Sequence, residues 1–185
     1  PVAEDFPAVG RGNLRTFPVM DRMTPDMGRL LGYIVAEGWT NDRKSFRISQ
    51  CPEKNPKVRA DIEDLLQRLM GWTAEPEKDI RVQSVFLRDY LLRMGVGYGI
   101  AKDKTVPEAI LRSSKETVRQ FIRGLVDAEG HVGGEGRNHI EFSTASEQLG
   151  RELQILLLRF GIMSSRRPKK AKGYDHTYWR LTVSG

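Results

Sequence analysis

The apolar residues follow two spacings that alternate along the chain and predict helices separated by strands. Residues 57–70 and 147–160 carry leucine and isoleucine at intervals of three and four, which is typical of amphipathic helices. Each of these stretches runs up to a glycine, a common helix stop. Residues 46–50 and 140–144 instead alternate apolar and polar positions, as half-buried strands do. The pattern therefore predicts the order strand, then helix, twice.

A nine-residue motif precedes each of these units. Residues 30–38 read LLGYIVAEG and residues 122–130 read IRGLVDAEG, and both have a glycine, a mostly apolar stretch and Ala-Glu-Gly. Glu37 and Glu129 are 129 − 37 = 92 residues apart, about half of the 185-residue chain. We therefore expect two similar halves, each with the order helix, two strands, helix, two strands.

The two halves are expected to differ at their ends. In the second half the last two strands are predicted at about 162–168 and 176–183, joined by a basic turn. The first half continues into an apolar helix near 85–94. The resulting division is an N-terminal extension (1–23), a first half (24–100), a linker (101–115) and a second half (116–185).

The two motifs have small residues at helical spacing. Gly32 and Ala36 lie four residues apart, as do Gly124 and Ala128, and residues at that spacing share one face of a helix. Gly28 extends the first row. Because a stripe of small residues lets two helix backbones approach closely, we expect the two motif helices to form the seam between the halves.

Each motif helix is predicted to end on a glutamate, where a carboxylate is unfavourable. The C-terminus of a helix carries partial negative charge, so an acid there costs roughly 0.3–1 kcal/mol. Tight parallel packing would also bring Glu37 and Glu129 together, where like charges repel. Incidental acids on capped helices are the alternative, but the repeat of the motif and its downstream elements favours a cation between them. Hard divalent ions, Mg²⁺ above all, bind carboxylate and water oxygens.

The composition of the chain indicates a negatively charged binding partner. Hydrophobic residues make up 39% and charged residues 29%, which is typical of globular proteins. Lys and Arg number 30 against 24 Asp and Glu, a formal net charge of +6 that favours a polyanionic partner such as nucleic acid. The single cysteine, Cys51, excludes a disulfide framework or a Cys-based zinc site. No apolar run approaches the roughly 18–20 residues that span a bilayer, so we expect no membrane partner and an intracellular setting (cytoplasm or nucleoid).

The two motifs resemble the signature helices of LAGLIDADG homing endonucleases. The stretch KTVPEAILRSSKETVRQFIRGLVDAEG (104–130) is similar to the part of intein-borne members that leads into the second motif. The stretch LQILLLRFGI (153–162) resembles the helix that follows. The resemblance covers about residues 27–184 and implies an α+β fold with a duplicated, pseudo-twofold αββαββα arrangement. In this fold two antiparallel sheets form a saddle over DNA.

The resemblance implies a site-specific endonuclease that breaks both strands of a long, largely asymmetric double-stranded DNA target, leaving 3′ overhangs. Cleavage would be divalent-metal-dependent phosphodiester hydrolysis with Mg²⁺, for which Mn²⁺ can substitute. By motif position the metal lies at Glu37 and Glu129, with Gly38 and Gly130 beside them. Both motifs lie in one chain, so a monomer is expected. The alternative is a catalytically inactive DNA-binding relative or an RNA maturase, and an intein, an intron or a free gene remains open as the host.

Further polar residues match positions near the active centre of such enzymes. Gln50 resembles a glutamine often found at the end of the first alternating run, although an exposed strand residue is the alternative. Thr144 occupies the matching place in the second half. Lys104 resembles a lysine of intein-borne members that lies near the active centre, which makes it a candidate catalytic residue with Gln50 and the two acids. The second-half lysine stays open among Lys169, Lys170 and Lys172.

Basic residues gather in three predicted hairpin segments. RRPKKAK (166–172) places five positive charges in seven residues, and we interpret it as a phosphate contact in preference to a solvated hairpin tip. The predicted DNA-binding residues are Arg43, Lys44, Arg47, Arg137, Asn138, Arg166, Arg167, Lys169, Lys170 and Lys172.

Overall fold

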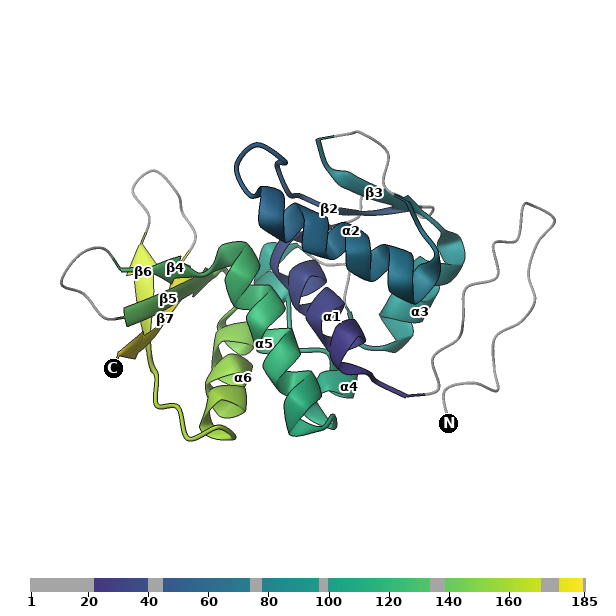
Figure 1. Ribbon diagram of the computed structural model, residues 1–185. Helices are drawn as coiled ribbons and strands as arrows, with labels where there is room; N and C mark the ends of the chain where they lie inside the picture. The colour runs from purple at the N-terminus through teal and green to yellow at the C-terminus, as the bar shows by residue number, and fades with distance from the viewer. Residues whose placement is uncertain are drawn as a thin grey trace.

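The computed structural model describes residues 22–39, 45–73, 78–96, 100–133, 139–170 and 177–184, and it has two antiparallel sheets around a central group of helices (Figure 1). The elements of the first half are α1 (Pro25–Glu37), β1 (Gly38–Trp39), β2 (Ser45–Ile48), α2 (Pro56–Met70), β3 (Ile80–Gln83) and α3 (Val85–Arg93). Two short helices follow, η1 (Ala101–Asp103) and α4 (Glu108–Leu111). The second half contains α5 (Lys115–Glu129), β4 (His131–Val132), β5 (His139–Thr144), α6 (Glu147–Leu158), β6 (Ser165–Lys170) and β7 (Thr177–Ser184). This α+β arrangement confirms the predicted fold class.

The two motif helices begin at side-chain caps. The hydroxyl of Thr24 accepts a hydrogen bond from the Met27 backbone N–H at 3.2 Å, and Pro25 occupies the first turn of α1. The hydroxyl of Ser114 accepts a hydrogen bond from the Thr117 backbone N–H at 3.3 Å and starts α5 in the same way. Each helix then runs through its motif and ends on the glutamate, as predicted.

Helices α1 and α5 pack against each other along the stripe of small residues and lie side by side at the centre of the molecule (Figure 1). A Cβ atom on Gly32 would lie 2.2 Å from the carbonyl oxygen of Phe121, and one on Gly124 would lie 2.3 Å from that of Arg29. A Cβ atom on Gly28 would likewise lie 2.7 Å from a carbonyl oxygen of α5. Only glycine allows backbones this close, which confirms the predicted seam.

The first sheet has the order β1-β2-β3, and its inner face is closed by helices. Phe46 pairs with Val82 and Ile48 with Ile80, and all four side chains are buried. The sequence predicted two strands after the helix at 57–70, but β3 is the one strand that the described residues hold between α2 and α3. Residues 74–77, where part of that prediction fell, lie outside the described ranges. The apolar helix expected near 85–94 is α3.

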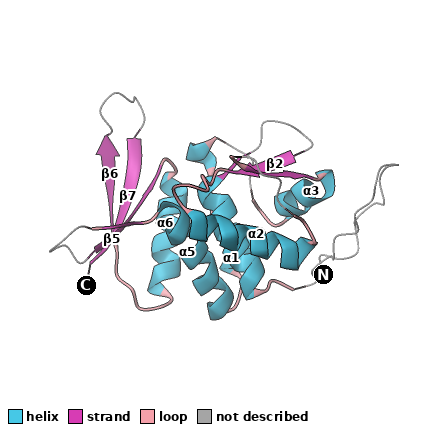
Figure 2. Cartoon of the chain, turned by 45° about the horizontal axis from the view of Figure 1, so that its top comes forward, coloured by secondary structure: helices cyan, strands magenta, loops and turns pink. Residues whose placement is uncertain are grey.

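The second sheet has the order β4-β5-β7-β6, so its last two strands form an antiparallel hairpin at one edge. These are the strands predicted at about 162–168 and 176–183, although β6 begins and ends later than expected. Phe142 and Leu181 face each other across β5 and β7 and are buried. Figure 2 shows the helices between the two sheets, with β5, β6 and β7 on one side and β2 on the other.

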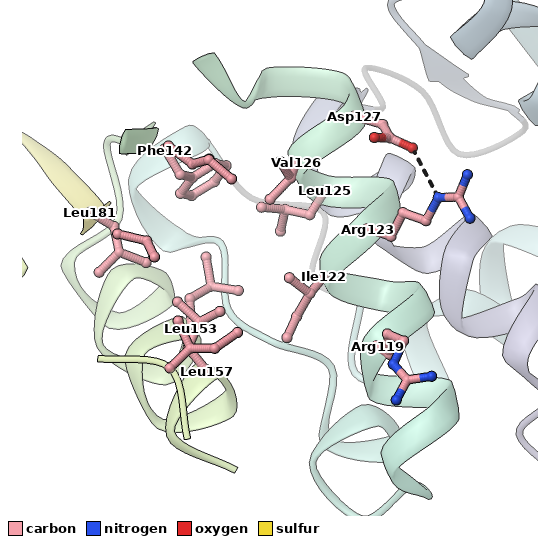
Figure 3. Close-up of a pocket in the computed structure, with 13 residues that line it drawn as sticks. Arg119, Ile122, Arg123, Leu125, Val126, Asp127, Phe142, Leu153, Leu157 and Leu181 are labelled. Atoms are coloured by element: carbon pink, nitrogen blue, oxygen red, sulfur yellow. Dashed lines mark ion pairs between the residues drawn. The ribbon is translucent and has the colours of Figure 1, made fainter. Parts of the chain in front are cut away.

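The inner face of the second sheet is less completely covered than that of the first. A pocket of about 330 Å³ opens between α5, α6 and this sheet, and its walls are mostly apolar (Figure 3). In the first half α3 lies against β2, with Leu87 and Leu91 buried. Phe46 of β2 is also buried, whereas Ile140 of β5, which the sheet registers place at the matching position, is 42% exposed in the pocket wall. Among the helices of the described ranges, none is long and apolar enough to cross a membrane.

Candidate active site

The parallel packing of α1 and α5 brings the two motif acids together. Across the seam Gly32 lies against Phe121, which is 121 − 32 = 89 positions later, and Arg29 lies against Gly124, which is 124 − 29 = 95 positions later. These two separations bracket the 92 positions between Glu37 and Glu129. The two glutamates are therefore equivalent residues at neighbouring helix ends. Because the helix C-termini point the same way, two carboxylates share one site with the negative ends of two helix dipoles.

This arrangement raises the pKa values of both acids. Burial of the carboxyl group is the largest cause for Glu129, followed by the charge of Glu37, and together they raise the pKa of Glu129 to about 7. Burial also raises the pKa of Glu37. Glu129 as a whole residue is exposed, so its carboxyl group is open to solvent on one side while protein surrounds it on the other. At neutral pH the carboxyl group of Glu129 is therefore partly protonated, and a bound cation would displace that proton.

Lys104 is the positive charge that faces both acids. Its Nζ donates a hydrogen bond of 2.6 Å to the carbonyl oxygen of Ala36 in the last turn of α1. The hydroxyl of Ser146 donates a 2.6 Å hydrogen bond to the Lys104 carbonyl and fixes the backbone. Burial lowers the pKa of Lys104, whereas the charges of Glu129 and Glu37 raise it. The ammonium group thus caps one motif helix and offsets the repulsion between the two carboxylates.

Gln50 is buried and lies just beyond the end of β2, so the alternative of an exposed strand residue is wrong. Its side-chain oxygen accepts a hydrogen bond from Asn55 Nδ2 at 3.3 Å, and its carbonyl accepts one from Arg59 Nη1 at 3.1 Å. The preceding Ser49 N–H donates to the Glu37 carbonyl oxygen at 3.1 Å. Gln50 is therefore held in a segment bonded directly to the end of α1.

The sheet registers place Thr144 at the position of the second half that matches Gln50. Gly38 lies opposite Ile48, two residues before Gln50. His131 lies opposite Glu141, so the same antiparallel register places the residue before His131 opposite Phe142, two residues before Thr144. Thr144 is buried, and its hydroxyl accepts a hydrogen bond from the backbone N–H of Ser146 at 3.1 Å. The two halves thus present different groups at equivalent places.

Gly38 and Gly130 end the motif helices without left-handed backbone angles, since their φ values are −78° and −68°. Glycine is required here for another reason. A Cβ atom would lie 2.3 Å from the Ile34 carbonyl oxygen at Gly38, and 2.4 Å from the Val126 carbonyl oxygen at Gly130. Each glycine lets the chain turn sharply off the helix and leaves the neighbouring glutamate at an open end.

The chemistry of this donor set fits a magnesium site that DNA would complete. Within the described residues, no group of three or more His, Cys, Asp or Glu side chains lies close enough to hold a metal. Mg²⁺ is usually bound through one or two carboxylates together with waters and substrate phosphates, not in an all-protein cage. Glu37 and Glu129 would supply those carboxylates. Neither acid is among the residues that line the apolar pocket of the second half (Figure 3).

The predicted DNA-binding residues fall on different faces. Arg167, Lys169 and Lys170 are exposed on β6. Arg166 instead turns toward α6, where it pairs with Glu147 at 3.2 Å and lies over the Trp179 ring at 4.5 Å. These contacts attach β6 to α6, and the DNA-binding role of Arg166 stays a prediction. Arg43, Lys44, Arg137, Asn138 and Lys172 lie outside the described residues.

Sequence reasoning missed two arginines on the outer faces of the sheets. Arg81 lies directly opposite Arg47, and Arg180 lies directly opposite Arg167. The alternation of IRVQ in β3 places Arg81 on the face opposite to Ile80 and Val82 and is the signal that was available. Its partner strand depends on a register that a single sequence does not reveal.

Comparison with known proteins agrees with this geometry. Residues 116–185 match a family model described as a LAGLIDADG-like domain. The replication factor C small subunit of Methanocaldococcus jannaschii is 27% identical over 86% of this chain and 9% of its own length. The DNA polymerase of Thermococcus hydrothermalis is 29% identical over 82% of this chain and 9% of its own. The chain thus spans about a tenth of the length of these two relatives.

Solved structures show the same fold over most of the chain. A mesophilic variant of the homing endonuclease I-DmoI has a TM-score of 0.62 at 19% identity, covering 86% of this chain and 88% of that one. An I-DmoI variant in complex with nicked target DNA and manganese has a TM-score of 0.64 at 18% identity, covering 89% and 90%. Full-length DUF199/WhiA from Thermatoga maritima has a TM-score of 0.59 at 15% identity, covering 90% and 53%.

Residues 116–185 are thus similar to the LAGLIDADG-like domain, and the chain as a whole has the fold of I-DmoI, with two motif helices in one polypeptide. This agrees with the resemblance in the sequence.

The raised pKa of Glu129 predicts how stability depends on pH. Because the folded-state pKa, about 7, lies above the ordinary value of 4.5, the folded protein binds this proton more tightly than the unfolded chain. The stabilisation is complete below pH 4.5 and is lost as the pH rises through 7. We expect Glu129→Gln to raise the melting temperature at pH 8 and to change it little at pH 4.5, in EDTA. A thermal melt of both proteins at the two pH values checks this, and an equal shift at both would contradict it.

Proposed function

We propose that this protein is a site-specific homing endonuclease that cuts both strands of double-stranded DNA by divalent-metal-dependent hydrolysis. One observation carries the proposal: two parallel helices end side by side on Glu37 and Glu129, with Lys104 coupled to both charges. The unfavourable placement of two acids at negative helix ends is explained by a function that needs them there.

Each residue of the site has a chemical task in this proposal. Mg²⁺, when bound, supplies a Lewis acid that polarises the phosphate and lowers the pKa of a bound water. Glu37 and Glu129 would hold the ion. Because the pKa of Glu129 is raised, its carboxyl group must lose a proton before the ion binds. We therefore expect cleavage to increase as the pH rises through about 7. Lys104 would place a cation beside the scissile phosphates, and Gln50 would order water at the first motif.

The relatives support an origin within a longer host protein. Segments similar to this chain occur in proteins named replication factor C small subunit and DNA polymerase, and each match covers 9% of the whole protein. An aminotransferase of Methanocaldococcus jannaschii contains another, over 15% of its length. A segment shared by proteins with three such different names is the pattern of an element inserted into a host protein, and we propose an intein as the host element. A monomer would suffice, since both acids lie in one chain.

A second candidate is a binding protein that does not cut. The similarity to DUF199/WhiA, which covers 90% of this chain, favours it. The paired acids and the lysine that faces them favour the nuclease, because binding alone gives no reason to keep two carboxylates where DNA phosphates would approach.

The test is a cleavage selection on a duplex library of random and host-derived sequences, in Mg²⁺ and in EDTA, with the ends sequenced. If the protein is a nuclease, we expect defined double-strand ends in Mg²⁺ and none in EDTA. Enrichment of bound, intact duplexes would identify a binding protein. If the protein neither bound nor cleaved duplex DNA, the proposal would be overturned and RNA would become the candidate partner.

Lys104→Met should reduce cleavage and shift its pH profile upward. Removing the ammonium group leaves the two carboxylates without their shared positive neighbour, so both pKa values rise and the acids are ionised only at higher pH. We expect a loss of about 100- to 1000-fold at pH 7, the order of magnitude for removing a single electrostatic group from an active site. Lys102→Met, two residues away in η1 and exposed, is the matched control. Equal pH profiles for the two variants would contradict the assignment.

A further inference from the structure

The outer face of the first sheet carries a row of residues that stability does not explain. Trp39, Arg47 and Arg81 lie directly opposite one another across β1, β2 and β3. Like charges that face each other across a strand pair are destabilising. Within the described ranges neither arginine has an ion-pair partner, and the Nε atom of each is buried without a hydrogen-bond acceptor. The row therefore holds two guanidinium groups whose Nε donors have no partner among the described residues.

The geometry of the row holds these groups in place. The guanidinium carbon of Arg47 lies 5.4 Å from the centre of the Trp39 ring, a cation–π contact that restricts its side chain. Both arginine side chains are partly buried, which limits their rotamers further. A planar, fixed guanidinium presents parallel N–H donors and matches a pair of acceptors such as O6 and N7 of guanine.

The equivalent row of the second sheet has the opposite chemistry. Because His131 corresponds to Trp39, its row runs through Glu141, Thr182 and Ser165. The carboxylate of Glu141 pairs with Arg180 at 3.3 Å and lies 3.4 Å from His139 Nε2. At the level where the first half places two arginines, the second half thus places an acid and two hydroxyls.

We propose that Arg47 and Arg81 read guanine in the half-site bound by the first sheet, and that the matching position of the other half-site has no such requirement. This inference rests on the proposed function, since it needs the two sheets to face duplex DNA. It adds to that function a base identity and a reason why the target is asymmetric. The two pseudo-symmetric sheets would read equivalent base pairs with unlike groups.

The experiment is a binding selection on randomised duplexes in Ca²⁺, with the intact chain, for wild type, Arg47→Gln and Arg81→Gln. Glutamine pairs with N6 and N7 of adenine, as arginine pairs with O6 and N7 of guanine. We expect wild type to enrich guanine at one or two positions of one half-site. Each variant should change one of those positions toward adenine, moving the guanine-to-adenine ratio by about 10- to 100-fold.

The controls separate base reading from charge and folding. Arg112→Gln removes the same charge from an exposed residue at the C-cap of α4 and should leave every base preference unchanged. Arg81→Lys keeps the charge and should retain guanine with reduced discrimination, so it serves if Arg81→Gln melts early. A uniform loss of affinity across all sequences, with a smaller salt dependence, would show phosphate contacts and overturn the inference. Failure of wild type to enrich any duplex would instead overturn the proposed function itself.

Discussion

Replacing Glu37 or Glu129 by glutamine is expected to reduce cleavage by about a thousandfold or more while DNA binding is retained. Glutamine keeps the shape of the side chain but removes the charge that would hold the metal, and metal stabilisation is worth several kcal/mol. Binding should stay the same or tighten, because each acid lies where phosphates would approach. Single-turnover cleavage and equilibrium binding on one selected duplex measure the two effects separately.

The matched control for the acids is Glu108→Gln, an exposed glutamate on α4 that pairs with Arg112. It removes the same charge and should leave cleavage unchanged. Cleavage within tenfold of wild type for both Glu37→Gln and Glu129→Gln would contradict the proposed active site. A loss in only one of them would show that the two halves do not contribute equally.

The second large effect is on stability. Gly32→Ala should destabilise the protein by about 3 kcal/mol, since the new Cβ atom would lie 2.2 Å from the Phe121 carbonyl oxygen and only a separation of the two backbones relieves the clash. Urea unfolding, with the midpoint and slope compared to wild type, measures this cost. The helix ends would also separate, so we expect cleavage to fall together with stability.

Gly150→Ala is the matched control for this substitution. Gly150 lies inside α6, and its nearest neighbour to a new Cβ atom would be the Arg166 side chain at 3.2 Å, which can move. Alanine is favoured over glycine inside a helix by roughly 1 kcal/mol, so this variant should be neutral or more stable. If Gly32→Ala were as stable as Gly150→Ala, the close packing of the two motif helices would be wrong.

Local patterns were sufficient to predict the seam and its acids. The spacing of Gly28, Gly32 and Gly124 defines a helix face by itself, and the motif repeat places Glu37 and Glu129 at equivalent positions. The period-two alternation of the first strand also predicts the burial of Gln50. It shares the parity of the buried Phe46 and Ile48, and it is buried like them.

Features that depend on pairing between distant strands were beyond sequence reasoning. The position of Arg166 follows from the β6–β7 register, which turns it toward α6, whereas the basic run around it predicted a phosphate contact at a turn. The pairing of Arg47 with Arg81 joins strands that are separated by a whole helix. Alternation gives the face of each strand, but only the three-dimensional register shows which residues meet across it.

The apolar pocket of the second half is the main difference in packing between the halves. Leu153, Leu157 and Leu181 contribute to its walls beside residues of α5 (Figure 3). Nothing in its lining resembles the paired carboxylates of the seam, so the chemistry proposed here does not depend on it.

The most direct test of the central claim is strand-resolved cleavage of one selected duplex by the wild-type protein, with each strand labelled separately. We predict that both strands are cut in Mg²⁺, at positions offset to leave short 3′ overhangs, and that neither is cut in EDTA. A duplex that is bound with sequence preference but stays intact on both strands in Mg²⁺ would contradict the assignment of Glu37 and Glu129 to a nuclease centre.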